Sequence, residues 1–337
     1  RAAVWALASH ALYTHIQLPA PPGHSWGTDA PARIRNDPRE NIAIMLRIGF
    51  EIYGGCAILF ALVMLIFWRP SQRDLRSLHA RREQKRLAIC VISGAVGRLA
   101  FVLSLGLAIS ATYVGLHHAM PLVWVVAYRS RRKRRAAAFP DLLAAGTLCA
   151  ALAVMCAGDM QEPLEDWEVD VKWAALPLVV FSSLLRALQR YRTKSLKAHF
   201  SFRLMLLATM CADSVTMLIA ALAADANVLT RIVEASSEEA ISAGLAILAM
   251  TFAVISDVLL AKYFDIVSGL SLTALTLPAA AAFFRAFAIG APAVTYIMIL
   301  ALLAILSTVI ALGSGEVNRR TKNLVLGEDQ DTQHAMP

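Results

Sequence analysis

The sequence predicts an all-α integral membrane protein with about ten transmembrane helices, arranged as two inverted five-helix repeats. Three observations carry this prediction: an apolar composition, apolar blocks long enough to cross a bilayer, and loops whose charge alternates along the chain. Hydrophobic residues make up 58% of the 337 residues and charged residues only 17%, whereas soluble domains carry roughly 25% charge. The mean hydropathy of +0.59 disfavours a water-soluble globule.

The apolar blocks have the length of membrane helices, because a hydrocarbon core of about 30 Å requires about 20 helical residues. Runs such as residues 58–68 do not alternate between polar and apolar residues, which disfavours the strands of a membrane barrel. The stretch Leu87–Tyr128 is long enough for two crossings, so we place a reversal near residues 110–112. The expected helices are residues 2–18, 43–67, 87–109, 112–128, 139–157, 173–189, 204–224, 240–262, 267–285 and 292–313.

The loops between these helices alternate in charge. The second, fourth and sixth are basic and contain RPSQRDLRSLHARREQKR, RSRRKRR and RALQRYRTKSLKAH, whereas the fifth, GDMQEPLEDWEVDVK, and the seventh are acidic. Short cytoplasmic loops are enriched in Lys and Arg, so we expect both termini to be cytoplasmic. The net charge of +8 then reflects these loops and contact with anionic lipid, and it does not indicate nucleic-acid binding.

These features divide the chain into four parts. Residues 1–157 form the first five-helix repeat and include a long loop at 19–42. Residues 158–172 form an acidic, non-cytoplasmic linker, residues 173–313 form the second repeat, and residues 314–337 form a cytoplasmic tail expected to be disordered. The first residue is Arg1 rather than Met, so we expect further residues to precede it.

An internal repeat is indicated by a recurring separation of 157 residues. It relates Pro121 to Pro278 and Ala111 to Ser268, and it also relates residues 158–159 to residues 315–316. Because each half holds an odd number of helices, the second half must enter the membrane in the opposite sense. Each proline removes a backbone hydrogen bond near the middle of a helix. Paired interrupted helices indicate a midplane binding site, and packing kinks without a ligand are the alternative.

Two ionisable residues stand at membrane depth, where each costs at least about 2.5–3.5 kcal/mol. Arg98 lies roughly 16 Å along its helix from Leu87, close to the midplane. It could clamp a phosphate or carboxylate, or it could form a structural ion pair with Asp213. Asp213, which is flanked by Ala212 and Ser214, could correspondingly be a proton-coupling group or the counter-ion of Arg98.

Other polar residues in the apolar blocks are weaker candidates. Tyr113 and His117, four residues apart, could line a cavity or pack as hydrogen-bonded core residues. His117 and His118 point about 100° apart on a helix, which disfavours a metal pair. Arg47 and Glu51 are expected to neutralise each other, and a role in substrate binding is the alternative.

Near the cytoplasmic end of the helix expected at 240–262, Asp257 and Lys262 can reach water at little cost. They are therefore weak candidates on position alone.

The segments SATYVGLHHAMPLVWVVAY, GTLCAALAVMCAGD and KYFDIVSGLSLTALTLPAAAAFF together resemble the drug/metabolite transporter superfamily over almost the whole chain. The resemblance implies ten helices in two inverted repeats around a central cavity, and transport by alternating access. Residues 262–266 also resemble the lysine-tyrosine segment of the nucleotide-sugar branch, which implies substrate binding by Lys262. A second lysine usual in that branch is absent, with Ser268 close to its place. The acidic residue that many bacterial members carry before helices five and ten is also absent, since the chain reads AAAFP and AIGAP there.

No enzyme motif is present in the sequence: there is no GxGxxG, Walker A, HExxH or GxSxG pattern and no paired-cysteine zinc signature. The five cysteines lie in apolar blocks and are expected to be packing residues. We therefore expect no enzymatic activity, catalytic residue, metal or cofactor.

The expected function is secondary transport or exchange of a small polar organic solute, anionic solutes included, by alternating access. A non-transporting membrane subunit or scaffold is the alternative. The expected partners are the solute and membrane lipid, and a homodimer is left open. The residues expected at the substrate site are Arg98, Tyr113, His117, Pro121, Asp213, Lys262 and Pro278.

Overall fold

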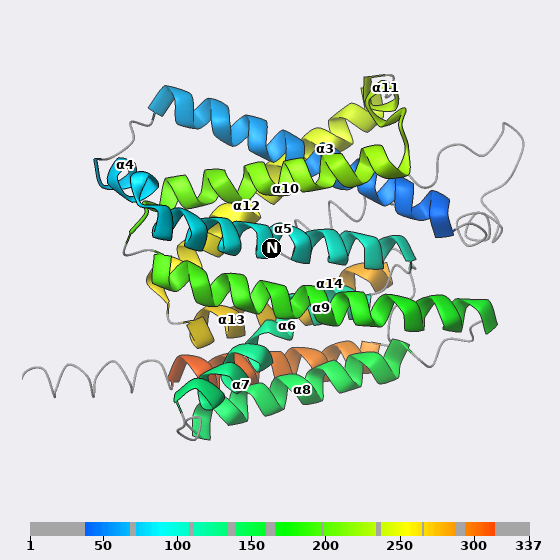
Figure 1. Ribbon diagram of the computed structural model, residues 1–337. Coiled ribbons are helices and arrows are strands. Elements are labelled where there is room, and N and C mark those ends of the chain that lie inside the picture. The colour runs from blue at the N-terminus through cyan, green and yellow to red at the C-terminus, as the bar shows by residue number, and fades with distance from the viewer. Residues whose placement is uncertain are drawn as a thin grey trace, which may run out of the picture.

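The computed structural model describes residues 38–67, 72–107, 111–133, 139–159, 166–196, 199–233, 237–264, 266–286 and 294–313. Within these ranges every regular element is a helix, and most of the long helices lie side by side (Figure 1). The helix expected at 2–18, most of the loop at 19–42 and the tail at 314–337 lie outside the described residues.

Seven of the nine other expected helices each coincide with one helix of the structure, and two coincide with a pair of consecutive helices. The helices are α3 (Pro38–Phe67), α4 (Gln72–His79), α5 (Arg81–Leu107), α6 (Ala111–Ala119), α7 (Pro121–Lys133), α8 (Phe139–Asp159), α9 (Asp166–Leu196), α10 (Phe202–Ala224), α11 (Val228–Val233), α12 (Ser237–Tyr263), α13 (Ile266–Ala274), α14 (Thr276–Ala286) and a last helix, Val294–Gly313.

Several helices extend into segments that the sequence analysis treated as loops. α9 has 31 residues and includes part of the acidic linker at its start and part of the sixth loop at its end. Basic side chains such as Arg192 and Lys194 favour a helix C-terminus because of the helix dipole. Basic residues that mark the sixth loop in the sequence therefore also favour the C-terminal end of α9.

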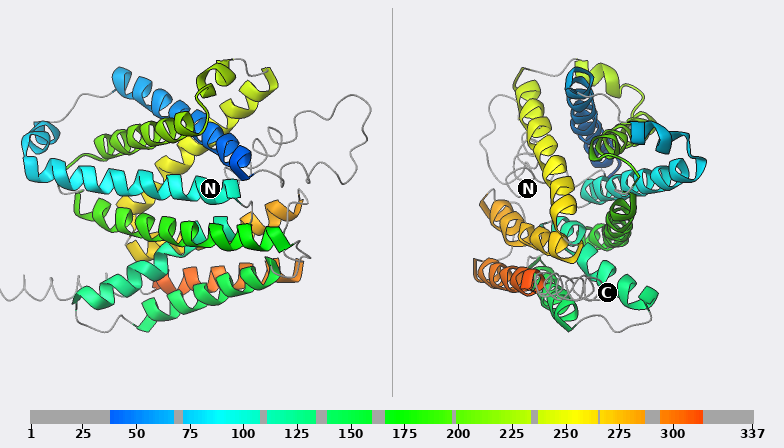
Figure 2. Two further views of the ribbon diagram at one scale, coloured as in Figure 1. Left: turned by 45° about the vertical axis from the view of Figure 1, so that its right-hand side comes forward. Right: turned by 90° about the vertical axis from the view of Figure 1, so that its left-hand side faces the viewer.

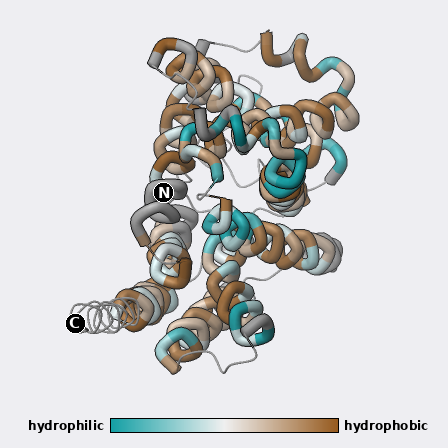
Figure 3. Tube along the Cα trace, turned by 60° about the vertical axis from the view of Figure 1, so that its left-hand side comes forward, coloured by the Kyte–Doolittle hydropathy of each residue, from teal (hydrophilic) through white to brown (hydrophobic). Residues whose placement is uncertain are grey.

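Five helices in the described part of the chain are long and apolar enough to cross a membrane, which makes this an all-α integral membrane protein. They are Arg39–Met64, Arg81–Leu107, Phe139–Ala157, Phe202–Ala224 and Val294–Gly313. Hydrophobic residues dominate the sides of these helices, and hydrophilic residues gather mainly toward helix ends (Figure 3).

Successive long helices run in opposite directions (Figures 1 and 2). The helix ends that flank the basic connections, at residues 67–72, 133–139 and 196–202, lie together on the left in Figure 1. The ends that flank the acidic connections, at residues 159–166 and 224–237, lie on the right. We call these the basic end and the acidic end; their separation agrees with the expected alternation of loops.

Two of the expected helices are interrupted. The helix expected at 112–128 consists of α6 and α7, which meet at Met120, directly before Pro121. The helix expected at 267–285 consists of α13 and α14, which meet at Leu275, so that Pro278 lies in the first turn of α14. Proline is tolerated in a first turn, where its missing N–H has no helical partner. The two interrupted helices pack against each other through α6 and α14.

The interrupted helices also contact their neighbours in equivalent ways. Thr112 Oγ1 donates to the carbonyl of Met155 at 3.5 Å, and Ser268 Oγ donates to the carbonyl of Ala311 at 3.2 Å. Both donor and acceptor are shifted by 156 residues between the two bonds, one residue fewer than the separation of Pro121 and Pro278, so Ser268 corresponds here to Thr112 and not to Ala111. The same shift relates four buried positions on α8 to four on the last helix. The positions on α8 are Ala144, Leu148, Ala151 and Met155, and those on the last helix are, in the same order, Leu300, Ala304, Ser307 and Ala311.

Glycines allow α5 to approach its neighbours closely. A methyl group at Gly97 would lie 3.3 Å from the carbonyl oxygen of Ser182 on α9, and one at Gly106 would lie 2.9 Å from Cα of Ile42 on α3. The first distance is tight and the second is too short for a real contact, so α5 and α3 could not keep this spacing with any larger residue at Gly106.

We expect Gly106→Ala to lower the free energy of unfolding by about 1–3 kcal/mol, because the clash is with backbone that cannot rotate away. Gly146→Ala is the matched control, since no atom lies within 4 Å of its added methyl group; alanine also favours a helix over glycine. Thermal unfolding of both purified variants in detergent would check this. Equal midpoints for the two variants would contradict the close packing of α5 on α3.

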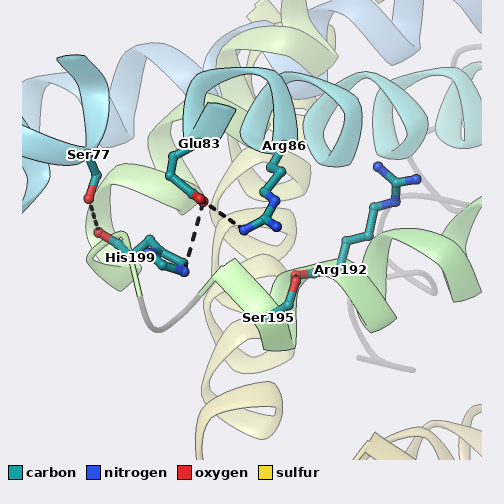
Figure 4. A network of polar contacts seen from close by, with 6 residues as sticks. All are labelled: Ser77, Glu83, Arg86, Arg192, Ser195 and His199. Carbon is teal, nitrogen blue, oxygen red and sulfur yellow. Dashed lines mark hydrogen bonds and ion pairs between the residues drawn. The ribbon is translucent and has the colours of Figure 1, made fainter. Parts of the chain in front are cut away.

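At the basic end, polar contacts tie α4 and α5 to the short connection between α9 and α10 (Figure 4). Ser77 Oγ donates to the carbonyl of His199 at 2.7 Å, and Glu83 lies 2.9 Å from Arg86 and 3.9 Å from His199 Nε2. Asp74, fully buried, accepts from the backbone N–H of Ser201 at 2.6 Å. Because Ser201 caps the N-terminus of α10, the carboxylate also stabilises the positive end of that helix.

Asp74→Ala should destabilise the protein by about 1–3 kcal/mol, because it leaves a part-buried N–H without its acceptor. Asp225→Ala is a suitable control: Asp225 also accepts from a backbone N–H, that of Asn227 at 2.9 Å, but in an exposed position. Its effect should stay within about 0.5 kcal/mol. Denaturation midpoints measured side by side would test the difference, and a control variant as unstable as Asp74→Ala would count against it.

Candidate functional site

A buried cluster of polar side chains forms where α5 and α9 pack together and meet α3, α6 and α10. In Figure 1, α10, α5 and α9 lie in succession beside one another. We call the following residues the central polar cluster: Tyr53 on α3, Arg98 on α5, His117 on α6, Ser182, Arg186 and Gln189 on α9, and Asp213 on α10.

Arg98 and Asp213 form an ion pair between α5 and α10, with Arg98 Nη2 2.7 Å from Asp213 Oδ1. The Asp213 side chain is 3% exposed and that of Arg98 is 20% exposed. A second guanidinium nitrogen, Nη1, donates to Gln189 Oε1 on α9 at 3.4 Å. The pair is the structural alternative that the sequence analysis left open for both residues, and a role in solute binding stays a prediction.

The hydrogen bonds of His117 fix the position of its ring proton. Arg186 Nη1 lies 2.9 Å from His117 Nε2, and Ser182 Oγ lies 2.5 Å from His117 Nδ1. A guanidinium only donates, so Nε2 must accept and the proton of the neutral ring must sit on Nδ1, which donates to Ser182. The ring also stacks on Phe101, with centroids 4.0 Å apart and planes at 13°. His117 is therefore held on both nitrogens and on one face.

α9 presents a stripe of polar residues to its neighbours that the sequence analysis did not identify. Arg186 lies in the helix expected at 173–189, but it was counted with the basic residues of the sixth loop. Residues of the stripe recur every three or four positions, which places them on one face of a helix. This regular spacing is the signal in the sequence that indicates the stripe. It includes Ser182, Ser183, Arg186, Gln189 and Thr193. Ser183 accepts from Trp124 Nε1 on α7 at 3.0 Å, so the stripe contacts three different helices.

Three guanidinium groups lie near one another in this region. Arg98 and Arg190 both repel Arg186 electrostatically, and Arg98 repels Arg190. Such repulsion is strong where little water screens it. Three guanidinium groups and the carboxylate of Asp213 therefore gather in this part of the helix bundle.

The other predicted site residues fall in different places. Tyr113 is buried in the main apolar core, and Pro121 and Pro278 lie at the two helix interruptions. The His118 carbonyl accepts from Thr273 Oγ1 on α13 at 2.7 Å. Lys262 lies on the last turn of α12, and its side chain, like that of Asp257, lies outside the described residues.

Arg47 and Glu51 on α3 form an ion pair at 3.6 Å. This confirms the pairing that their spacing of four residues predicted.

No protein-family model matches the chain, and no curated protein is similar to it. A solved structure titled "Crystal structure of protein" aligns with 91% of this chain and 98% of its own chain, at 14% identity and a TM-score of 0.48. A similarity at this level carries no argument about fold or function.

The position of Gln189 depends on Gly94, because a methyl group at Gly94 would overlap the Gln189 amide. We expect Gly94→Ala to displace that amide from Arg98 and to cost about 1.5–3 kcal/mol, as for other hydrogen bonds to charged groups. In a Gln189→Ala background the same substitution should hardly lower the free energy of unfolding, because no amide then occupies the space of the added methyl group. Unfolding midpoints of the four proteins in this cycle would measure the coupling; additive effects would argue against it.

Proposed function

We propose that this protein is a secondary membrane transporter or exchanger that moves a small polar organic solute, anionic solutes included, by alternating access. The central polar cluster is its solute site. The observation that carries the proposal is the depth of this cluster: Arg98 and Asp213 stand near the middle of two membrane helices. An ionisable group there costs at least about 2.5–3.5 kcal/mol and in membrane proteins marks substrate and ion pathways.

The helix arrangement supports a second element of the proposal, two inverted five-helix repeats. Both interrupted helices carry a proline in the first turn of their second segment, and equivalent hydrogen bonds and buried positions recur at a shift of 156 residues. In transporters built from inverted repeats, solute sites lie near the midplane beside such interrupted helices. His117 belongs to the last turn of α6, directly before the interruption, so the cluster occupies that place.

The orientation in the membrane follows from the same helix directions. Loops rich in Lys and Arg face the cytoplasm in membrane proteins, so we assign the basic end to the cytoplasmic side. The last helix ends at Gly313 on that side, which supports a cytoplasmic C-terminus. An N-terminal helix before α3 would place the N-terminus there as well.

Uptake of a panel of labelled carboxylates, phosphate esters and neutral sugars into proteoliposomes tests the proposal. Transport of at least one of these solutes above empty liposomes is the expected result. A folded, reconstituted protein that moves none of them would instead favour a non-transporting subunit or scaffold.

The ion pair gives a sharper test of the site. Arg98→Gln alone leaves Asp213 buried without its partner and should cost about 3–5 kcal/mol, whereas Arg98→Gln with Asp213→Asn should recover most of the stability. We expect uptake by the double variant to recover in parallel, measured at matched abundance. Arg47→Gln with Glu51→Gln serves as the control pair. A stable double variant without uptake would show that the pair itself contacts the solute or its coupling ion.

A further inference from the structure

We propose that the central polar cluster binds an oxyanion together with a proton, and that Arg186 takes the oxyanion while Nε2 of His117 takes the proton. The oxyanion is a carboxylate, phosphate or sulfate group of the solute. This inference rests on the proposed function, because it specifies the chemistry of the same site, and it assigns the two central roles to residues other than Arg98 and Asp213.

The existing contacts determine where a proton can bind on His117. Nδ1 already carries a proton and donates to Ser182 at 2.5 Å, so a second proton can only enter at Nε2. That nitrogen accepts from Arg186 at 2.9 Å. Stacking on Phe101 holds the ring in this orientation. Protonation must therefore occur at the atom that faces the guanidinium.

A protonated His117 and Arg186 cannot keep this contact. Both facing atoms would be donors, and both groups would be cationic, next to the further positive charge of Arg98 and Arg190. An oxyanion between them resolves both conflicts, because it accepts from the guanidinium and from Nε2–H through charge-assisted hydrogen bonds. One N–H bond forms on His117 and one O–H bond of a hydronium ion breaks, which leaves water. For a monoanion the net charge of the site is unchanged.

The charged and titratable groups around this pair come from every described helix that forms the cluster. α9 contributes Arg186 and Arg190, α5 contributes Arg98, α10 contributes Asp213, α3 contributes Tyr53, and α6 itself contributes His118. Asp213 is the competing proton site. Its 2.7 Å contact with Arg98 opposes that role, because protonation would weaken the ion pair without helping an anion to bind at Arg186.

Inorganic sulfate is the appropriate probe, because it stays ionised over the range of about pH 6–8 in which histidine titrates. Any proton taken up on sulfate binding then belongs to the protein. Purified full-length protein in weakly buffered detergent should take up as much as about one proton per sulfate bound. Because proton and sulfate binding are linked, the sulfate affinity should rise up to about tenfold per unit fall in pH while His117 is neutral.

The variants assign the two roles. His117→Gln, whose amide can still accept from Arg186 and donate to Ser182, should bind sulfate without proton uptake and with an affinity independent of pH. His118→Gln, a change at the adjacent residue, is the matched control and should keep the wild-type coupling. Arg186→Gln should lose sulfate binding. The double variant Arg47→Gln with Glu51→Gln, which removes an ion pair outside the cluster, should keep both binding and proton uptake.

Wild-type protein that binds no sulfate, or binds it without protons, overturns the proposal, and this result needs no variant to fold. Proton uptake that persists in His117→Gln, or disappears in His118→Gln or in the double variant, assigns the proton elsewhere and also overturns it. Transport is tested separately in liposomes that enclose a pH-sensitive dye. Coupled binding without solute entry would refute transport alone, whereas solute entry that does not depend on pH would refute only the shared proton and oxyanion site.

Discussion

The ion pair between Arg98 and Asp213 joins the middle parts of α5 and α10, two helices long and apolar enough to cross a membrane, and several contacts of the surrounding helices form around it. A lone guanidinium on α5 would need a partner within the membrane, and α10 supplies one at 2.7 Å. The other terminal nitrogen of the Arg98 guanidinium donates to Gln189 on α9. One charged residue thereby links three helices, which explains why α5 packs so closely on α9 and, together with α3, on α10.

This packing depends on glycines as much as on polar residues. Gln189 can reach Arg98 because Gly94 leaves room for its amide, and Gly97 lets α5 approach the backbone of α9 near Ser182. In a membrane, where apolar side chains gain little by leaving lipid, close packing around small residues and interhelical hydrogen bonds supply much of the association energy. The glycines of α5 and the polar stripe of α9 therefore work as one interface.

The sequence alone predicts those structural features that are determined by one segment of the chain or by residues one helical turn apart. The nine expected helices that fall within the described residues are helical, both prolines lie at helix interruptions, and Arg47 pairs with Glu51. The ion pair of Arg98 with Asp213 was one of two stated alternatives, because two opposite charges at similar depth make a pair plausible without proving contact. These features follow from hydropathy, backbone chemistry and charge, which are properties of single segments or of residues one turn apart.

The polar stripe on α9 could not be identified in the same way. Arg186, Arg190 and Arg192 lie close together in the sequence, and the rule that basic residues mark cytoplasmic loops counted all three with the sixth loop, although the helix expected at 173–189 includes Arg186. That rule counts charge and ignores the direction in which each side chain points. Whether an arginine near a helix end faces water or a neighbouring helix depends on that neighbour. Here the neighbour is His117 on α6, 69 residues away in the chain.

The interruption between α6 and α7 connects this cluster to the other half of the molecule. Pro121 cannot donate to the carbonyl of His117, four residues earlier, so the backbone next to the polar cluster lacks a helical hydrogen bond. The adjacent carbonyl, that of His118, accepts from Thr273 on α13 at 2.7 Å. The same short segment therefore presents a histidine side chain to α9 and a backbone acceptor to the second interrupted helix. Because both contacts depend on the local backbone at residues 117–118, a change in the Arg186–His117 bond would be transmitted to α13 through two adjacent residues. This is a physical route by which the occupancy of the cluster can be coupled to the packing of the two interrupted helices.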